Sequence, residues 1–301
     1  MKKIKFVLLI TFIVIACSLY AQHDNALEYG FQILEINSSP SMSGMGDTGA
    51  LATDDGLSFM NNPVAGLFNR SRIITVSQNF WLSDINIISG GYSLNKRKYH
   101  WGFGFQQLSY GKMEQRTETG EIVGEFHPVD FIGTINYGYR LGATHYFGIN
   151  TKMLYEKIHT ASSIGFSADL GYAWATPLKD LKLYSAVKNL GSTGKMDKEK
   201  IDLPVNYEVG VLKELFLAHY DLAFDAKVHK SLDTDVAYNF GFQVKTFEIL
   251  YLRGGYKINN DTNDLSFGIG IDYDSFNVDY AYLQMTNDFD NVHKISLSYK
   301  F

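Results

Sequence analysis

The chain has 301 residues, a formal net charge of -5 and a mean hydropathy of -0.11, and 15% of its residues are aromatic. The negative charge argues against the basic surface of a nucleic-acid-binding protein, so we expect no nucleic-acid partner. Many Tyr and Phe residues with such moderate hydropathy are typical of membrane barrels, in which apolar and polar residues alternate.

The first 21 residues have the pattern of an export signal. A basic start over 2–5 is followed by an apolar run over 6–16, and Ala21 precedes a suitable cleavage site. The run is too short for a membrane-spanning helix. The single cysteine, Cys17, lies in a weak lipoprotein-like box in which Ile15 is bulky, so we expect cleavage after Ala21 rather than lipidation. The mature chain then has no thiol for a disulfide or a metal.

The next segment, 22–70, has a different composition. Its central part is rich in small residues and also contains apolar ones, whereas a disordered tail is charged and poor in apolar residues. Small residues let a backbone pass close to a wall of side chains. We therefore expect a plug, or hatch, inside a barrel, with a disordered tail as the alternative. Residues 41–67 should fold into the periplasmic half of the lumen, where the acids at 47, 54 and 55 would meet inward lysines such as Lys227 or Lys245. The candidate hatch residues are Gly44, Gly46, Gly49, Asn62 and Pro63.

From residue 71 to the end, apolar and polar residues alternate with period two. In 220–228, for example, Leu222 and Phe224 share one predicted face of a strand with Tyr220 and Val228. The opposite face carries charges and is expected to line a hydrated lumen. The lumen-facing candidates are Asp221, Asp225 and Lys227. A solute path is one interpretation of these charges, and a lumen that pairs its own charges is the one we favour.

We predict an all-β protein: a transmembrane antiparallel β-barrel of about 14 strands, an even number as in bacterial barrels. Most segments are long enough for tilted strands to cross a membrane. They are 71–80, 84–94, 98–110, 128–141, 144–158, 162–176, 180–190, 204–214, 218–230, 235–246, 248–258, 264–274, 275–285 and 292–301. The connections after even-numbered segments are short and the longest two, 111–127 and 191–203, follow odd-numbered ones, so both ends of the barrel chain are expected at the periplasmic side.

The last segment alternates up to an aromatic end. Ile295, Leu297, Tyr299 and Phe301 share one face. This pattern resembles the signal read by the outer-membrane insertion machinery, which we expect as a partner together with outer-membrane lipid. Tyr299 and Phe301 are the candidate assembly residues. The predicted organisation is therefore a signal peptide at 1–21, a periplasmic or plug segment at 22–70 and a transmembrane barrel at 71–301.

The N-terminal motifs resemble the PorV/PorQ family, which belongs to the long-chain fatty-acid-transporter-like (FadL-like) barrels. They are FQILEI at 31–36, SSP at 38–40, MSGMGDTGALA at 42–52, DD at 54–55 and NPVAGL at 62–67. Val64 departs from the family pattern, which has a small residue after Asn-Pro. The resemblance implies a barrel with an N-terminal hatch that binds the translocon or cargo of type IX protein secretion. The alternative, by analogy with fatty-acid transporters, is a passive transporter of hydrophobic small molecules across the outer membrane.

The sequence contains no enzyme signature. The eight histidines have no metal-ligand spacing, and no Gly-x-Ser-x-Gly elbow is present. The glycine pairs at 102–104 and 268–270 lie within predicted strands, where they leave room for a neighbouring backbone rather than a phosphate. We predict a non-enzyme with no catalytic, cofactor-binding or metal-binding residues and no cofactor.

Overall fold

The structure is a computed structural model that describes residues 29–69, 72–82, 85–196, 199–232, 234–260, 263–286 and 289–301. The predicted signal peptide and its cleavage site lie outside the described residues. Within those residues, no helix has the length and apolar character needed to cross a membrane.

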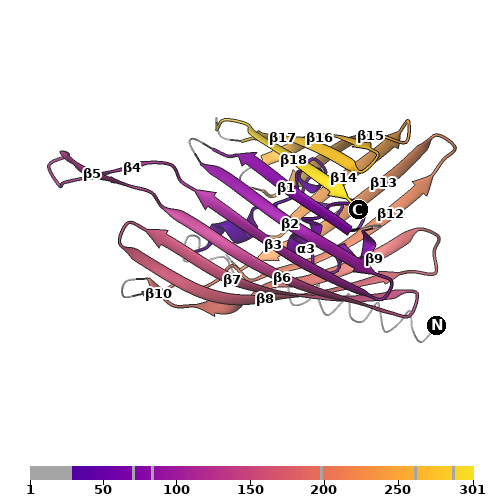
Figure 1. Ribbon diagram of the computed structural model, residues 1–301, viewed down its shortest axis with the longest axis horizontal. Helices are drawn as coiled ribbons and strands as arrows, with labels where there is room; N and C mark the ends of the chain where they lie inside the picture. The colour runs from indigo at the N-terminus through magenta and orange to yellow at the C-terminus, as the bar shows by residue number, and fades with distance from the viewer. Residues whose placement is uncertain are drawn as a thin grey trace.

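In the described chain, fourteen long strands form one closed antiparallel barrel (Figure 1). The strand order is β1-β18-β17-β16-β15-β14-β13-β12-β9-β8-β7-β6-β3-β2, and β2 returns to β1. The first and last strands close the ring, with Ile73 opposite Lys300. The predicted all-β barrel is thus confirmed. The strands are β1 Arg72–Phe80, β2 Asn86–Lys96, β3 Tyr99–Ser109, β6 Val129–Leu141, β7 His145–Ile158, β8 Ala161–Ala175, β9 Leu181–Thr193, β12 Asn206–Phe216, β13 Tyr220–Ser231, β14 Ala237–Thr246, β15 Leu250–Ile258, β16 Asn263–Tyr273, β17 Phe276–Met285 and β18 Val292–Lys300.

Each strand has one exposed apolar face and one buried face. On β14, Phe240 and Phe242 are 45% and 47% exposed on the outside, whereas Asn239, between Tyr238 and Phe240, is 2% exposed. The large apolar residues on the outside form the surface that meets lipid, and the polar positions between them face the lumen. This inside-out arrangement follows directly from the period-two pattern of the sequence.

The two ends of the barrel differ in their connections. Arg72 and Lys300 lie at one end, where the turns between strands are short, such as the two residues between Lys96 and Tyr99. The long connections lie at the other end. Because barrels have short periplasmic turns and longer outer loops, we name the first the periplasmic end and the second the outer end.

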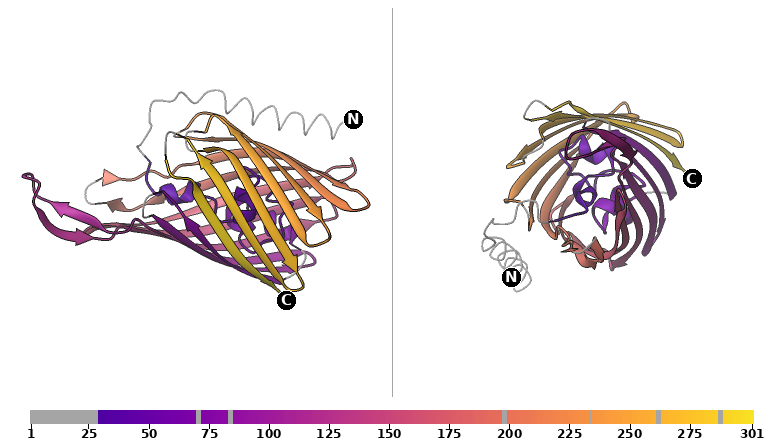
Figure 2. Two further views of the ribbon diagram at one scale, coloured as in Figure 1. Left: turned by 90° about the horizontal axis from the view of Figure 1, so that it is seen from above. Right: turned by 90° about the vertical axis from the view of Figure 1, so that its left-hand side faces the viewer.

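The two longest connections contain strands that the sequence pattern did not predict. β4 (Met113–Arg116) and β5 (Ile122–Phe126) form a hairpin that projects well beyond the barrel rim (Figure 2, left). β10 (Lys195–Met196) and β11 (Glu199–Lys200) form a second small sheet. Both sheets belong to the outer end.

The described segment before β1, residues 29–69, runs inside the ring of strands (Figure 2, right). It has four short helical elements: η1 (Gln32–Glu35), α2 (Pro40–Ser43), α3 (Ser58–Asn61) and η2 (Ala65–Phe68). Its apolar side chains pack on inward-facing wall residues and form most of the buried apolar clusters. One cluster joins Met42, Leu51 and Val64 to Tyr184 and Leu212 of the wall. We call residues 29–69 the hatch.

Candidate binding pocket in the barrel lumen

The hatch extends along the length of the lumen. Near the outer end, the Gly30 amide donates to the Asp202 carbonyl over 3.3 Å. Near the periplasmic end, the Leu67 carbonyl accepts from Asn95 over 3.1 Å and from Arg140 over 2.8 Å. We expected 41–67 in the periplasmic half of the lumen. The first part of that range instead lies beside the outer halves of β14 and β15.

Glycines let the hatch backbone touch the wall. A Cβ at Gly255 of β15 would lie 2.0 Å from the Gly46 nitrogen, and one at Gly44 would lie 2.8 Å from the Gly268 Cα. Gly46 and Gly49 also have positive φ angles of 66° and 75°. Side chains at these positions would therefore push the hatch away from β15 and β16 or strain its turn.

Asn62 and Pro63 are anchored in the periplasmic half of the hatch. The Asn62 amide donates to Oε1 of Glu208 over 2.8 Å. The Pro63 carbonyl accepts from Nδ2 of Asn136 over 2.9 Å, and a Cβ on Gly148 would overlap that carbonyl at 2.2 Å. These contacts tie the Asn-Pro motif to β6, β7 and β12.

A serine–histidine–asparagine chain in the wall has the spacing of an acid–base triad. Ser93 Oγ lies 2.8 Å from Nε2 of His100, whose Nδ1 lies 2.6 Å from Oδ1 of Asn136. Both Ser93 and His100 are fully buried, and Asn69 donates to the same serine hydroxyl over 2.9 Å. A Cβ on Gly66 would overlap the His100 ring at 2.2 Å. This hydrogen-bond chain therefore holds the end of the hatch, and a substrate has no access to the Ser93 hydroxyl.

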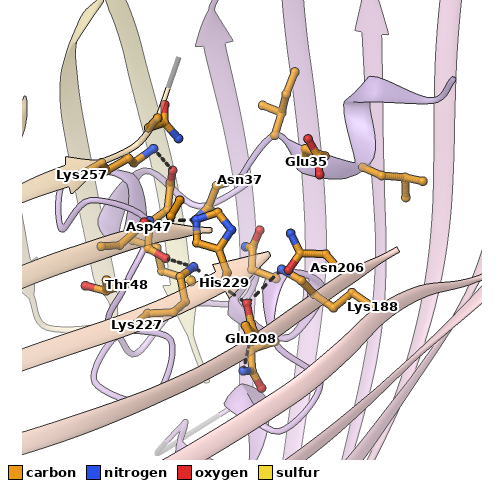
Figure 3. Close-up of a pocket in the computed structure, with 18 of the residues that line it drawn as sticks. Glu35, Asn37, Asp47, Thr48, Lys188, Asn206, Glu208, Lys227, His229 and Lys257 are labelled. Carbon is orange, nitrogen blue, oxygen red and sulfur yellow. Dashed lines mark hydrogen bonds and ion pairs between the residues drawn. The ribbon is translucent and has the colours of Figure 1, made fainter. Parts of the chain in front are cut away.

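A cavity of about 780 Å³ lies between the outer part of the hatch and the wall (Figure 3). It reaches from Tyr184 and Lys152 to Asp235 and Asn260 in the outer connections. Apolar side chains contribute to its lining, among them Leu34, Met42, Met60, Trp81 and Leu283. The wall adds His229 and the charged side chains Lys152, Lys188, Glu208, Lys227, Lys257 and Lys294.

Glu208 gathers two of the pocket lysines. Its carboxylate lies 3.1 Å from Lys188 Nζ and 3.9 Å from Lys227 Nζ. Lys152 pairs separately with the buried Asp169 over 2.7 Å. Charges taken out of water are tolerated when they are paired in this way. The pocket wall is therefore an ordered ionic surface.

The hatch contributes two acids to the pocket lining, Glu35 and Asp47, and Asp47 contacts the wall lysines. Its Oδ2 pairs with Lys257, and its carbonyl accepts from Lys227 Nζ over 2.7 Å (Figure 3). Ser43 donates to Oδ1 over 3.2 Å, and Lys294 donates to the same Ser43 hydroxyl over 3.0 Å. Burial alone raises the pKa of the Asp47 carboxyl, but the attraction of Lys257, Lys294 and Lys227 outweighs burial and holds the pKa well below its usual value.

The adjacent hatch acids Asp54 and Asp55 have different environments. Asp54 pairs with Lys300 over 3.3 Å. Asp55 is 2% exposed and accepts from Ser41 over 3.0 Å and from the Leu57 amide over 2.7 Å. Burial raises its pKa. We had expected these acids to meet Lys227 or Lys245. Lys227 does contact Asp47, whereas Lys245 pairs with Asp272 at 3.9 Å.

The lumen-facing candidates on β13 occupy different positions. Asp225 is buried and accepts from the Gly49 amide and from the Tyr184 hydroxyl, each over 2.8 Å. Lys227 faces the pocket. Asp221 has the same orientation on the strand but lies at the exposed periplasmic rim, opposite Phe216 and Lys245.

The aromatic end of β18 lies on the outer surface of the barrel. The Phe301 ring is 68% exposed and lies 4.8 Å from the Tyr299 ring, edge to face. The Phe301 amide donates to the Arg72 carbonyl over 2.9 Å. Their role as an assembly signal stays a prediction.

Several wall residues of the pocket were not predicted. Lys188, Glu208, Lys257 and Lys294 occupy inward positions of the alternating pattern, so the pattern contained their orientation. The pattern did not predict that these side chains would lie close together, because only the closed barrel and the hatch bring their strands to one pocket. Among the described residues, no three His, Cys, Asp or Glu side chains are placed to hold a metal ion.

Solved structures that share this architecture include a channel and a transporter for small molecules. A structure described as the CymD monoaromatic hydrocarbon channel aligns with a TM-score of 0.64 and 12% identity, covering 88% of this chain and 98% of that one. The Pseudomonas putida toluene transporter TodX aligns with a TM-score of 0.61 and 11% identity, covering 87% of this chain and 97% of that one. A Pseudomonas aeruginosa FadL homologue aligns with a TM-score of 0.58 and 11% identity, covering 88% of this chain and 98% of that one.

The chain has a FadL-like fold. No protein-family model matches the sequence, and no curated protein matches it either. At such low identity the likeness concerns the fold. It agrees with the barrel and hatch that the PorV/PorQ resemblance implied.

Proposed function

We propose that this protein is an outer-membrane transporter that admits small molecules from outside into the lumen, where the hatch controls their further passage. The observation that carries the proposal is the pocket of about 780 Å³, which extends from the outer connections to the hatch. Its volume lies within the range of small-molecule sites, roughly 300 to 1,000 Å³. Export through a signal peptide cleaved after Ala21, followed by insertion into the outer membrane, is part of this proposal.

The lining favours molecules that are partly polar. The hydrocarbon channels that share the fold suggest a hydrophobic substrate, and Met42, Met60 and Leu283 provide some apolar surface here. Lysines and asparagines contribute much of the remainder. A molecule that combines a small hydrocarbon part with a polar group therefore matches the pocket better than a pure hydrocarbon, which would leave these groups desolvated without a partner.

A reversible disulfide between hatch and wall tests the proposal. A Cβ at Gly241 of β14 would lie 2.1 Å from Oγ1 of Thr48, so cysteines at these two positions are close enough to be joined. The only native cysteine, Cys17, lies in the predicted signal. We expect proteoliposomes containing Thr48→Cys/Gly241→Cys to take up benzoate when reduced and to lose most uptake when oxidised. The single variants should not respond to oxidation. Equal flux in the two redox states of the double variant would contradict a controlling hatch.

A second candidate function is an interaction barrel of type IX secretion. The N-terminal resemblance suggests it, and the projecting β4–β5 hairpin supports it. Met113, Ile122 and Val123 of this hairpin are 39%, 56% and 57% exposed, and exposed apolar groups of this kind are found where proteins dock.

Affinity purification from detergent-solubilised membranes tests this candidate. The wild type should recover a translocon barrel or secreted cargo, and a variant in which 112–127 is replaced by a short turn should lose it while the barrel folds normally. Recovery of small molecules or lipid alone would leave transport as the function.

A further inference from the structure

The arrangement around Asp47 has the form of an occupied anion site. Lys227, Lys257 and Lys294 come from β13, β15 and β18 and converge on Asp47 of the hatch (Figure 3 labels Lys227, Lys257 and Asp47). Lys257 pairs with the carboxylate, Lys227 donates to the Asp47 backbone carbonyl, and Lys294 attracts the carboxylate through its charge. The side chains of Lys227 and Lys257 are 11% and 5% exposed, and Lys294 is 1% exposed. Glu208 also attracts Lys227, at 3.9 Å, but three ammonium groups buried so close together still need anionic partners.

The cluster faces the pocket. Asp47 and all three lysines belong to its lining, together with Asn239. The Asp47 side chain is 23% exposed, more than the lysines that hold it. A molecule in the pocket can therefore approach the lysines from the side on which Asp47 now lies.

The turn that carries Asp47 is held by this cluster and by hydrogen bonds of Gly46 and Gly49 with wall side chains. Gly46 and Asp47 both have positive φ angles, 66° and 59°. Asn239 donates to the Gly46 carbonyl over 2.7 Å, and Ser266 accepts from its amide over 3.0 Å. A left-handed conformation at a non-glycine residue is unfavourable by itself and persists where contacts impose it. Loss of the ionic contacts thus removes one of the two sets of contacts that keep the turn against the wall.

We propose that Lys227, Lys257 and Lys294 form a binding site for a carboxylate or phosphate group of a small molecule, and that this group displaces Asp47 and releases the hatch turn from the wall. The hatch carboxylate acts as an internal competitor. An incoming anion restores the charge balance that Asp47 provides, while the turn is freed to move. This inference rests on the proposed function, because it names the chemical class of the transported molecule and the contact that it breaks.

Anion binding to the purified full-length barrel in neutral detergent tests the site directly. Sodium benzoate and sodium phosphate are titrated by calorimetry at constant ionic strength. We expect Asp47→Asn to bind at least one probe about tenfold more tightly than wild type, because it lacks the competitor and keeps the lysines. Asp54→Asn is the matched control: Asp54 pairs with Lys300 outside the pocket lining, so the affinity should not change.

Lysine variants identify the binding groups. In the Asp47→Asn background, Lys257→Gln and Lys294→Gln should each weaken binding about tenfold or more, the effect of removing a buried charged partner of the anion. Lys300→Gln should have no effect. Binding of benzoate alone assigns the site to carboxylates, phosphate alone to phosphates, and both to anions generally. If neither probe binds, or if Asp47→Asn leaves the affinity unchanged, the inference is wrong.

Release of the turn is measured separately with Thr48→Cys, the hatch residue next to Asp47. Saturating probe should accelerate maleimide labelling of this cysteine severalfold, and Lys257→Gln/Lys294→Gln should abolish the acceleration. Binding without acceleration would contradict the displacement of Asp47. The flux assay with the disulfide-locked hatch does not depend on either measurement, so a failure of the proposed function and a failure of the anion site can be told apart.

Discussion

At the scale of single residues, the lumen and the lipid surface obey different energetic rules. A charged group on the inner face finds a partner, as Lys257 does in Asp47 and Arg253 does in Asp279 over 2.5 Å. A charged group on the outer face would have only lipid around it. The same substitution should therefore have different effects on stability at two neighbouring positions of one strand, so the facing of each position can be tested.

Acid should loosen the hatch turn through Asp47. The pKa of its carboxyl is held below the ordinary value of 3.8 by Lys257, Lys294 and Lys227, in spite of burial. A carboxyl whose pKa is lowered by docking stabilises the docked hatch above pH 3.8, and this stabilisation is lost as the pH falls below that value. We expect the conductance of wild-type barrels in planar bilayers to rise in this acidic range.

Asp47→Asn serves as the control for the acid response. Its conductance should be raised already at neutral pH and should change less below pH 3.8. Burial raises the pKa of Asp55, so its protonation at low pH stabilises the docked hatch, the opposite of the effect at Asp47. Asp55 is present in both proteins and therefore cannot cause a difference between them. An identical acid response in the two proteins would exclude Asp47 as the source.

The outer face of β13 provides a depth test. Phe224 and Tyr220 are each 49% exposed on the same face, but Phe224 lies near the middle of the strand and Tyr220 at its periplasmic end. Phe224→Arg should reduce the free energy of unfolding in vesicles by roughly 2 to 4 kcal/mol, and Tyr220→Arg by about 0 to 1 kcal/mol. Leu222, on the same face, is only two residues from the strand end and so lies farther from the membrane midplane than Phe224. Equal effects at both positions would mean that the membrane does not cover β13 as described.

At the scale of elements, the strands were predictable and the smaller sheets were not. Each of the fourteen predicted segments overlaps an observed barrel strand, because alternation over such lengths leaves one face apolar and the other polar whatever the partner. The β4–β5 hairpin lacks that alternation. All four residues of β4 are exposed, so nothing in its hydrophobic pattern distinguishes it from a loop.

The hatch was recognisable as a segment, but its contacts were not. Its small and apolar residues predicted packing inside a barrel, and Gly44 and Gly46 do touch the wall. The wall residues that receive them, Gly255 and Gly268, are about 210 residues or more away in the chain. Contacts over such separations depend on the closed barrel and leave no local signal in the sequence.

Two adjacent glycines of β15 test the contact between hatch and wall. A Cβ at Gly255 would collide with the Gly46 backbone at 2.0 Å, whereas one at Gly254 would meet the ring of the exposed Phe242 at 2.4 Å. A ring in lipid can rotate away, but the hatch backbone has no such freedom. Gly255→Val should therefore raise conductance in planar bilayers, and Gly254→Val should not. Similar conductance of the two variants would indicate that the hatch does not depend on this approach.

At the scale of the whole molecule, closure of the barrel makes the pocket possible. Five strands contribute charged side chains to the pocket: β9 carries Lys188, β12 Glu208, β13 Lys227, β15 Lys257 and β18 Lys294. β18 reaches them only because it pairs with β1 as well as β17. The hatch, which precedes β1, then lies along the axis of the ring that the later strands complete. Pocket and hatch are thus products of one topology.

The orientation of that topology in the membrane is the last prediction. The mature chain is expected to lack cysteine, because Cys17 lies in the predicted signal, so single cysteines can report on each end. Thr119 lies between β4 and β5 in the projecting hairpin, and Leu178, 67% exposed, lies in the short turn between β8 and β9. A membrane-impermeant maleimide should label Thr119→Cys on intact cells. It should label Leu178→Cys only after the outer membrane is permeabilised, because short turns face the periplasm. Labelling of Leu178→Cys but not Thr119→Cys on intact cells would show that the barrel has the opposite orientation in the membrane. The pocket would then open toward the periplasm.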